Sequence, residues 1–266
     1  MNKVLVGADP ELFFCNSRGS LVSVIGKLPG DKHNTHYIDQ DGNGILVDNV
    51  AAEFNTAPAD SAEAFINSVA KNLIELDERA AKLGLQLAAH VASASFPPEE
   101  MQDPEAWVFG CEPDFNAWDG GEANPKPAAE DEFLRSCGGH VHVGSGDLDK
   151  LAIVKAMDLF LGVPSLLMDP DQDRRKLYGK GGCFRPKPYG VEYRTLSNFW
   201  IWSTKSILWV YEQTQKAVEF VASGKNIPED VADLIRKAIN DSDMDAAGKV
   251  FDLFPEVIPP KELMAA

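Results

Sequence analysis

The amino-acid sequence predicts an α+β fold in which a curved, largely antiparallel sheet is backed by helices. Short apolar or alternating runs bounded by Gly, Pro, Asn and Asp follow one another without regular helices between them, which favours antiparallel over doubly wound parallel pairing. A chain of 266 residues suffices for one sizeable domain or two small ones, and no repeat of solenoid length divides it. We therefore expect one domain over residues 1–266, with a helical C-terminal extension from about residue 226.

The expected strands are the segments with alternating or compact apolar runs. They cover Val4–Phe14, Leu21–Ile25, Gly44–Val47, Val50–Thr56, Leu85–Ala94, Phe109–Ala117, Gly139–Val143 and Tyr189–Ser197.

The expected helices have apolar residues at helical spacing. The first begins at Asp60-Ser61 and ends before Gly84, as a capping residue and a terminal glycine predict. The others cover 149–161 with a continuation to 168, 200–223, 228–240 and 243–253. The Pro-rich stretches 97–104 and 119–131 are expected to be surface loops.

Composition limits the possible partners. The net charge of −16 argues against broad binding of nucleic acid, although it leaves room for a local basic pocket. The longest apolar runs are short and broken by charges, so no membrane span is expected, and the first residues lack the pattern of a signal peptide. The four cysteines are widely spaced and are interpreted as reduced thiols of a cytoplasmic protein.

Two acidic strand segments are candidate metal ligands. In GADPELFF, Asp9 and Glu11 are two residues apart, so on a strand both carboxylates share one face, where they must meet a cation or water. Glu53 lies in a small, apolar run, where an unpaired carboxylate is costly to bury. Asp48 either ends the preceding turn or joins Glu53 as a metal ligand, and both interpretations are open.

The segment RSCGGHVHVGSG places His140 and His142 on one strand face, with glycines on both sides. Imidazole is a frequent metal ligand, whereas a single strand histidine is more often a core residue with its hydrogen bonds satisfied. Cys137 raises a zinc alternative with Cys111, but the ligand spacing of a structural zinc site is absent.

A basic, glycine-containing segment follows, DRRKLYGKGGCFRPKPYGVEYRTLSNFW. Its glycines expose backbone N–H groups to an anion, and Glu192 and Arg194 share a strand face. This predicts a local phosphate pocket; the alternative is an exposed basic loop that balances nearby acids. The cations are Arg174, Arg175, Lys176, Lys180, Arg185, Lys187 and Arg194.

A further polar strand, GCEPDFNAW, carries Glu112, Asp114 and Asn116 on one face, which either lines a substrate pocket or meets water.

Together these clusters indicate phosphoryl-transfer chemistry. Divalent ions held by carboxylates and a histidine bridge nucleotide phosphates, while arginines offset charge as a phosphoryl group moves. Residue spacing alone does not identify the group that accepts the phosphoryl group, which is a carboxylate, an alcohol, a guanidine or water.

The motifs, in this order, resemble the glutamine synthetase and glutamate–cysteine ligase superfamily of carboxylate–amine ligases. GADPELFF, VAAEFNTAP, GGHVHVGSG and GVEYRTL each resemble a metal- or phosphate-binding segment of glutamine synthetase. The chain is most similar to a smaller, phage-type family, COOH–NH2 ligase type 2, over most of its length up to about residue 225.

The resemblance implies a glutamine synthetase-like catalytic domain that binds ATP with Mg2+ or Mn2+ and joins a carboxylate to an amine through an acyl phosphate. It implies that the metal ligands are Asp9, Glu11, Glu53, His140 and Glu192. It implies that His142 lies near the nucleotide or the carboxylate substrate. It also implies that Arg174, Arg175, Lys180, Arg185 and Arg194 bind the nucleotide phosphates, with Arg185, Glu192 and Arg194 catalytic. Glu112 and Asp114 are candidates for deprotonating the amine.

The sequence departs from the superfamily pattern at two of these positions. Asp9 replaces a glutamate, and the arginine expected two residues before Glu192 is missing, so Arg185 must take its place from further back. The substrates are expected to be small-molecule or peptide carboxylates and amines. Two other functions remain open: a phosphotransferase of the same fold group, and a nucleotide- or metal-binding module without turnover.

Overall fold

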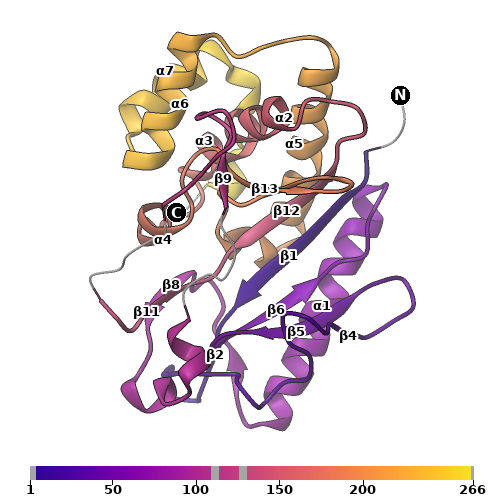
Figure 1. Ribbon diagram of the computed structural model, residues 1–266, viewed down its shortest axis with the longest axis vertical. Coiled ribbons are helices and arrows are strands. Elements are labelled where there is room, and N and C mark those ends of the chain that lie inside the picture. The colour runs from indigo at the N-terminus through magenta and orange to yellow at the C-terminus, as the bar shows by residue number, and fades with distance from the viewer. Residues whose placement is uncertain (1–3, 109–113, 126–130, 265–266) are drawn as a thin grey trace.

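A computed structural model describes residues 4–108, 114–125 and 131–264. Within them the main sheet has nine strands, and every neighbouring pair is antiparallel, as the sequence predicts (Figure 1). Their order is β10 (Glu122–Ala123), β9 (Phe115–Asn116), β13 (Cys183–Lys187), β14 (Gly190–Tyr193), β12 (Gly139–Gly144), β1 (Val6–Leu12), β6 (Ala51–Asn55), β5 (Gly44–Asp48) and β4 (His36–Tyr37).

Two small antiparallel sheets flank one end of the main sheet. One pairs β11 (Leu134–Ser136) with β8 (Ser93–Ser95), and the other joins β3 (Leu21–Val22), β2 (Phe14–Cys15) and β7 (Gln86–Leu87).

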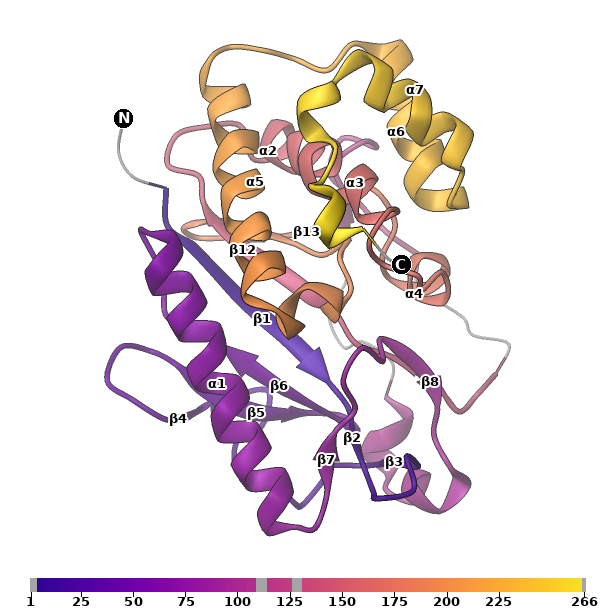
Figure 2. The same cartoon turned by 180° about the vertical axis from the view of Figure 1, so that it is seen from behind.

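Helices cover one face of the main sheet. Figure 2 shows α1 (Ala62–Lys82) and α5 (Thr204–Ala222) lying across this face, and α2 (Lys150–Met157) packs against α5 and β14. Strand alternation explains the choice of face, because Val6, Ala8, Val141 and Val191 all belong to the buried core under these helices. The opposite face carries the polar residues of the same strands.

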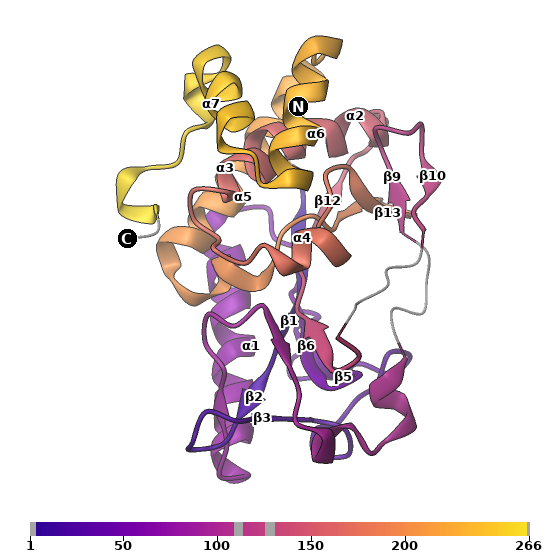
Figure 3. The same cartoon turned by 90° about the vertical axis from the view of Figure 1, so that its left-hand side faces the viewer.

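The remaining helices extend the molecule beyond the sheet. A π-helical turn (Asp158–Gly162) and α3 (Val163–Ser165) continue α2, while α6 (Glu229–Asp241) and α7 (Met244–Leu253) pack together in the C-terminal part. Figure 3 shows α1 and α5 on one side of β1 and β12, and the β9–β10 pair on the other. Short 3-10 helices cover Pro98–Met101, Pro104–Trp107, Asn198–Trp202, Pro255–Val257 and Lys261–Leu263.

Sequence patterns predicted α1, α2, α5, α6 and α7, with small shifts at the helix ends. Ser61 caps α1 by accepting a hydrogen bond from the Ala64 N–H, as its position before the apolar pattern suggests. No helix among the described residues is long and apolar enough to cross a membrane.

Several strand predictions were too long. The segment Leu85–Ala94 is split into β7 and β8, because His90 between them has a left-handed backbone (φ 62°), and Val4–Phe14 is split into β1 and β2. Residues 109–113 of the predicted strand Phe109–Ala117, and 126–130 of the predicted loop 119–131, lie outside the described residues.

The basic segment is more ordered than its composition suggests. It contains α4 (Asp173–Leu177) and the strand β13, neither of which was predicted because glycines and prolines interrupt both patterns. Pro186 is tolerated in β13 because the pairing of β13 with β9 involves only Cys183 and Phe184, so the missing N–H of Pro186 leaves no gap in that ladder.

Candidate active site

The polar face of the main sheet brings distant segments into one row. Residues directly opposite each other in neighbouring strands point to the same face. The register pairs that form the row are Arg185 with Glu192, Glu192 with His142, His140 with Asp9, and Glu11 with Glu53. Five strands, from β13 to β6, therefore contribute to a single surface.

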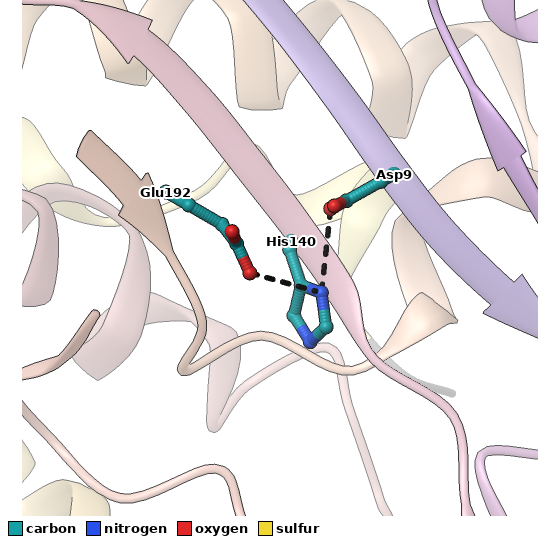
Figure 4. A group of neighbouring side chains, drawn as sticks. All are labelled: Asp9, His140 and Glu192. Carbon is teal, nitrogen blue, oxygen red and sulfur yellow. Dashed lines mark ion pairs between the residues drawn. The ribbon is translucent and has the colours of Figure 1, made fainter. Parts of the chain in front are cut away.

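Asp9, His140 and Glu192 form the first cluster of potential metal ligands, with one ligand atom from each lying within 4.8 Å of the others (Figure 4). The Nδ1 atom of His140 is 3.3 Å from Oδ1 of Asp9 and 3.8 Å from Oε1 of Glu192. Three adjacent strands, β1, β12 and β14, thus aim two carboxylates and one imidazole at the same point.

Burial keeps His140 neutral. Its desolvation, together with the nearby Arg194 guanidinium, lowers the pKa of His140 to about 3, so at neutral pH the ring offers a lone pair. Gly138 makes room for this ring, because a Cβ at residue 138 would lie 2.1 Å from Nε2 of His140. A glycine is therefore needed at residue 138 because any side chain there would collide with the His140 ring.

Glu11, Asp48 and Glu53 form the second cluster, again within 4.8 Å of one another. Burial and the nearby Asp48 raise the pKa of Glu11, and burial together with Asp9 and the other acids raises the pKa of Glu53 well above its usual value. Lys32 forms an ion pair with Asp48, at 2.7 Å between Nζ and Oδ1. Asp48, whose role the sequence left open, therefore lies beside Glu53.

Three cations surround the fully buried carboxylate of Glu192. Arg194 contacts its Oε1, Nζ of Lys187 is 2.6 Å from Oε2, and Nη1 of Arg185 is 3.5 Å from Oε1. Burial and the nearby Asp9 carboxylate work to raise the pKa of Glu192, but the positive charges around it, Arg194 before Arg185, outweigh them and hold the pKa below its usual value. Glu192 is thus an anion at neutral pH.

Residues of both clusters line one cavity of about 440 Å³, although the fully buried Glu192 does not line it, and neither does His142. Its lining includes Asp9, Glu11, Asp48, Glu53, His140, Arg174, Arg185, Lys187, Arg194, Lys32 and the apolar residues Val108, Leu134 and Leu177. Cations gather at the β13 and β14 end and carboxylates at the β6 and β5 end. A polyanion that also carries divalent cations matches this distribution of charge.

Arg174 and Arg175 lie outside the row of paired strand residues. Arg174 lines the cavity but is 2% exposed. Its guanidinium donates to the carbonyl oxygens of Leu196 and Arg194, and its Nη2 lies 3.3 Å from Nε2 of His140. Arg175 is an ion-pair partner of Asp169, at 3.4 Å, and does not line the cavity. Lys180 does not line it either.

His142 lies at the edge of the row. Its Nε2 is 3.0 Å from Oδ2 of Asp9, and its Nδ1 contacts the Tyr189 hydroxyl. Burial opposes protonation of His142, yet Asp9 more than compensates and raises its pKa. His142 is therefore placed to orient the Asp9 carboxylate.

The acidic strand around Asn116 is only partly described. Asn116 accepts a hydrogen bond from the Trp118 N–H and so holds a turn, and Asp114 does not line the cavity. Glu112 and Cys111 lie outside the described residues. Lys32 and Lys187 are cavity residues that the sequence interpretation did not select as site residues; only the basic composition around Lys187 signalled it.

The donor atoms of the two clusters suit Mg2+ or Mn2+. Five carboxylates and one neutral imidazole supply mainly oxygen ligands, which these hard cations prefer, and the three described cysteines are free thiols outside both clusters. The Oδ1 atom of Asp9 is buried and accepts no hydrogen bond of normal geometry, and Nδ1 of His140 lies 3.3 Å from it, so a cation between the two atoms would satisfy both.

An antiparallel sheet with two acidic clusters and guanidinium groups on one face forms a candidate site for divalent cations and phosphate. Residues 132–222, about a third of the chain, match the family model described as phage phiEco32-like COOH.NH2 ligase-type 2. The resemblance seen in the motifs is confirmed over this segment, which is similar to a family of carboxylate–amine ligases. The match contains His140, His142, Arg174, Arg185, Glu192 and Arg194.

Comparison with solved structures returns distant similarities. They include a GmaS/ADP complex (13% identity, TM-score 0.42, covering 96% of this chain and 69% of that one) and GmaS without ligand (14%, 0.39, 93% and 65%). A complex of the prokaryotic ubiquitin-like protein Pup with its ligase PafA is also similar (12%, 0.44, 97% and 60%). The chain thus spans about two thirds of these chains or less. A search of curated protein sequences returned no match.

Proposed function

We propose that this protein is an ATP-dependent carboxylate–amine ligase that forms an amide bond through an acyl phosphate. The observation that carries the proposal is that one cavity is lined by Arg185, Arg194 and residues of both acidic clusters. The family match over residues 132–222 supports the choice of ligation over other phosphoryl transfers.

The proposed reaction has two bond-forming steps. A carboxylate oxygen of the first substrate attacks the γ-phosphorus of ATP, and the bond to the leaving ADP oxygen breaks. The amine nitrogen of the second substrate then attacks the acyl carbon, the bond to phosphate breaks, and the nitrogen loses a proton. The products are an amide, ADP and phosphate.

The two clusters would hold divalent cations. Asp9, His140 and Glu192 would bind one, and Glu11, Asp48 and Glu53 a second, with Asp9 and Glu11 about 7 Å apart along β1 from the rise of a strand. When bound, such cations polarise phosphate oxygens and offset their charge.

Cationic side chains would stabilise the transferring phosphoryl group. Arg185 and Arg194 present guanidinium groups to the cavity from adjacent strands, and Lys187 lies beside them. Fixed donors aimed at the developing charge contribute most of the rate in this kind of reaction, so no strong nucleophile on the protein is needed. Arg174 would act indirectly, by holding His140 and the Arg194 backbone in place.

The substrates would be small-molecule or peptide carboxylates and amines, since the cavity has both charged and apolar walls. A cytoplasmic location, where ATP is available and thiols stay reduced, belongs to the same proposal, and the described cysteines are free.

The test is product formation from a panel of amino acids and dicarboxylic acids with ATP and Mn2+. Hydroxylamine serves as the trapping amine, because it converts an acyl phosphate to a hydroxamate. ADP and hydroxamate should appear only with a carboxylate and the amine together, and Glu192→Ala should abolish both. Arg18→Ala, which alters an exposed side chain outside the cavity, is the control.

Two results would contradict ligation. A stable phosphorylated product that forms without amine would identify a phosphotransferase. ATP and Mn2+ binding without turnover across the panel would identify a binding module.

A further inference from the structure

Lys32 lies in an unusual position, inside the acidic end of the cavity. Its Nζ is 2.7 Å from Oδ1 of Asp48, and the side chains of both residues are about three-quarters buried (26% and 24% exposed). Asp48 is one of the three carboxylates of the second cluster, with Glu11 and Glu53. An ammonium group therefore pairs with one of the carboxylates that the proposed function assigns to a divalent cation.

The negative charges of the two clusters are balanced by different numbers of cationic side chains. At the first cluster, Arg194, Arg185 and Lys187 all contact Glu192. At the second, Lys32 is the cation for which the described residues show an ion pair with a cluster carboxylate. Three neighbouring carboxylates repel one another strongly when partly buried, so a resident positive charge stabilises the metal-free arrangement.

The backbone around Lys32 is anchored, whereas its side chain is long. Asp31 and Asn34 exchange backbone hydrogen bonds of 3.1 Å, and the Asp31 carboxylate accepts from the His33 N–H. The Val47 N–H also donates to the carbonyl oxygen of Gly30. A closed turn attached to β5 thus holds Lys32 at the cavity, and only its flexible side chain needs to move for the ammonium to leave Asp48.

We propose that the Lys32 ammonium is a built-in competitor for the cation of the Glu11, Asp48 and Glu53 cluster. It occupies Asp48 until a divalent cation displaces it. The inference rests on the proposed metal sites, and it adds that the affinity of the second site is set by a side chain that is not a ligand.

Mn2+ titration followed by electron paramagnetic resonance of the free ion tests this directly, without an activity assay. The wild type should bind two Mn2+ ions with different affinities. Lys32→Met should tighten the weaker site about tenfold or more, because a positive charge a few ångströms from a divalent ion is removed. Lys32→Arg, which keeps the charge, should bind like the wild type.

Two further variants separate competition from a change in net charge. Lys237→Met removes another ammonium, the partner of Asp243 at 2.9 Å in the C-terminal helices, and should leave Mn2+ affinity unchanged. In an Asp48→Asn background, Lys32→Met should no longer tighten Mn2+ binding. Thermal unfolding of each variant confirms that it is folded.

An unchanged affinity in Lys32→Met, or equal tightening in Lys237→Met, would overturn the inference while leaving the ligase proposal intact. Absence of any Mn2+ binding by the wild type would overturn it together with the metal sites. If the Mn2+ affinities change as expected but no tested pair of substrates gives an amide, the role of Lys32 is supported and only the ligase activity is contradicted.

Discussion

Arg185 lies directly opposite Glu192 across the β13–β14 pair, and its Nη1 is 3.5 Å from Oε1 of Glu192. The arginine that the superfamily pattern places two residues before Glu192 has no room here. Residue 190 is a glycine with φ 157°, and a Cβ there would lie 2.0 Å from the carbonyl oxygen of Val143. Here the guanidinium of Arg185, on the neighbouring strand, lies beside Glu192.

This relationship predicts that Arg185 matters for phosphoryl transfer more than its place in the sequence suggests. Arg185→Met should lower kcat at least tenfold, because a guanidinium facing the transferring group is lost. Arg18→Met, at an exposed position, should keep kcat within twofold. Steady-state ADP release with saturating substrates measures both, and equal kcat values for the two variants would exclude a role for Arg185.

Arg175 should behave in the opposite way. Arg175→Met removes the partner of the buried Asp169 carboxylate, so we expect the free energy of unfolding to fall by about 3 kcal/mol. Because Arg175 does not line the cavity, the Kd for ATP should stay within threefold of the wild type. Urea unfolding and calorimetric ATP titration separate the two effects, and a large loss of ATP affinity in folded protein would contradict this placement.

Gly138→Ala tests the packing of the histidine strand. The new Cβ would collide with the His140 imidazole, so we expect the Asp9, His140 and Glu192 cluster to lose Mn2+ affinity at least tenfold, with about 2 kcal/mol of destabilisation. Gly248→Ala in α7 is the matched control. A Cβ there meets nothing within 4 Å, so this change should stabilise the helix by up to about 1 kcal/mol. Identical Mn2+ binding by both variants would show that His140 is not a ligand.

Asp158 should make stability depend on pH. This fully buried carboxylate accepts hydrogen bonds from Trp118 (2.7 Å) and Tyr193 (2.8 Å), and burial raises its pKa to about 7. The folded state keeps the proton up to pH 7, whereas the unfolded chain releases it near pH 4. The contribution of Asp158 is therefore complete below pH 4 and is lost as the pH rises to 7.

Asp158→Asn should remove this dependence while keeping most of the hydrogen bonds. Between pH 5 and pH 7.5 the wild type should lose about 2 kcal/mol relative to the variant in urea unfolding. Parallel stability curves for the two proteins would show that Asp158 ionises normally in the folded state.

Local pattern predicted much of the site, because side chains alternate along a strand. Spacing of two residues placed Asp9 with Glu11, His140 with His142, and Glu192 with Arg194 on common faces. Capping and periodicity likewise predicted α1. The same reasoning failed within the basic segment, where β13 and α4 form because neighbouring strands and helices stabilise residues whose own propensities are poor.

By itself, then, the sequence determined which residues share a strand face and where the α1 helix begins and ends, since these depend on neighbours a few positions away. Only the tertiary structure decided that Asp48 joins Glu11 and Glu53, that Arg185 faces Glu192, and that Arg175 turns away from the cavity. Those outcomes follow from strand order and register, which are set by hydrogen bonds and packing between segments far apart in the chain.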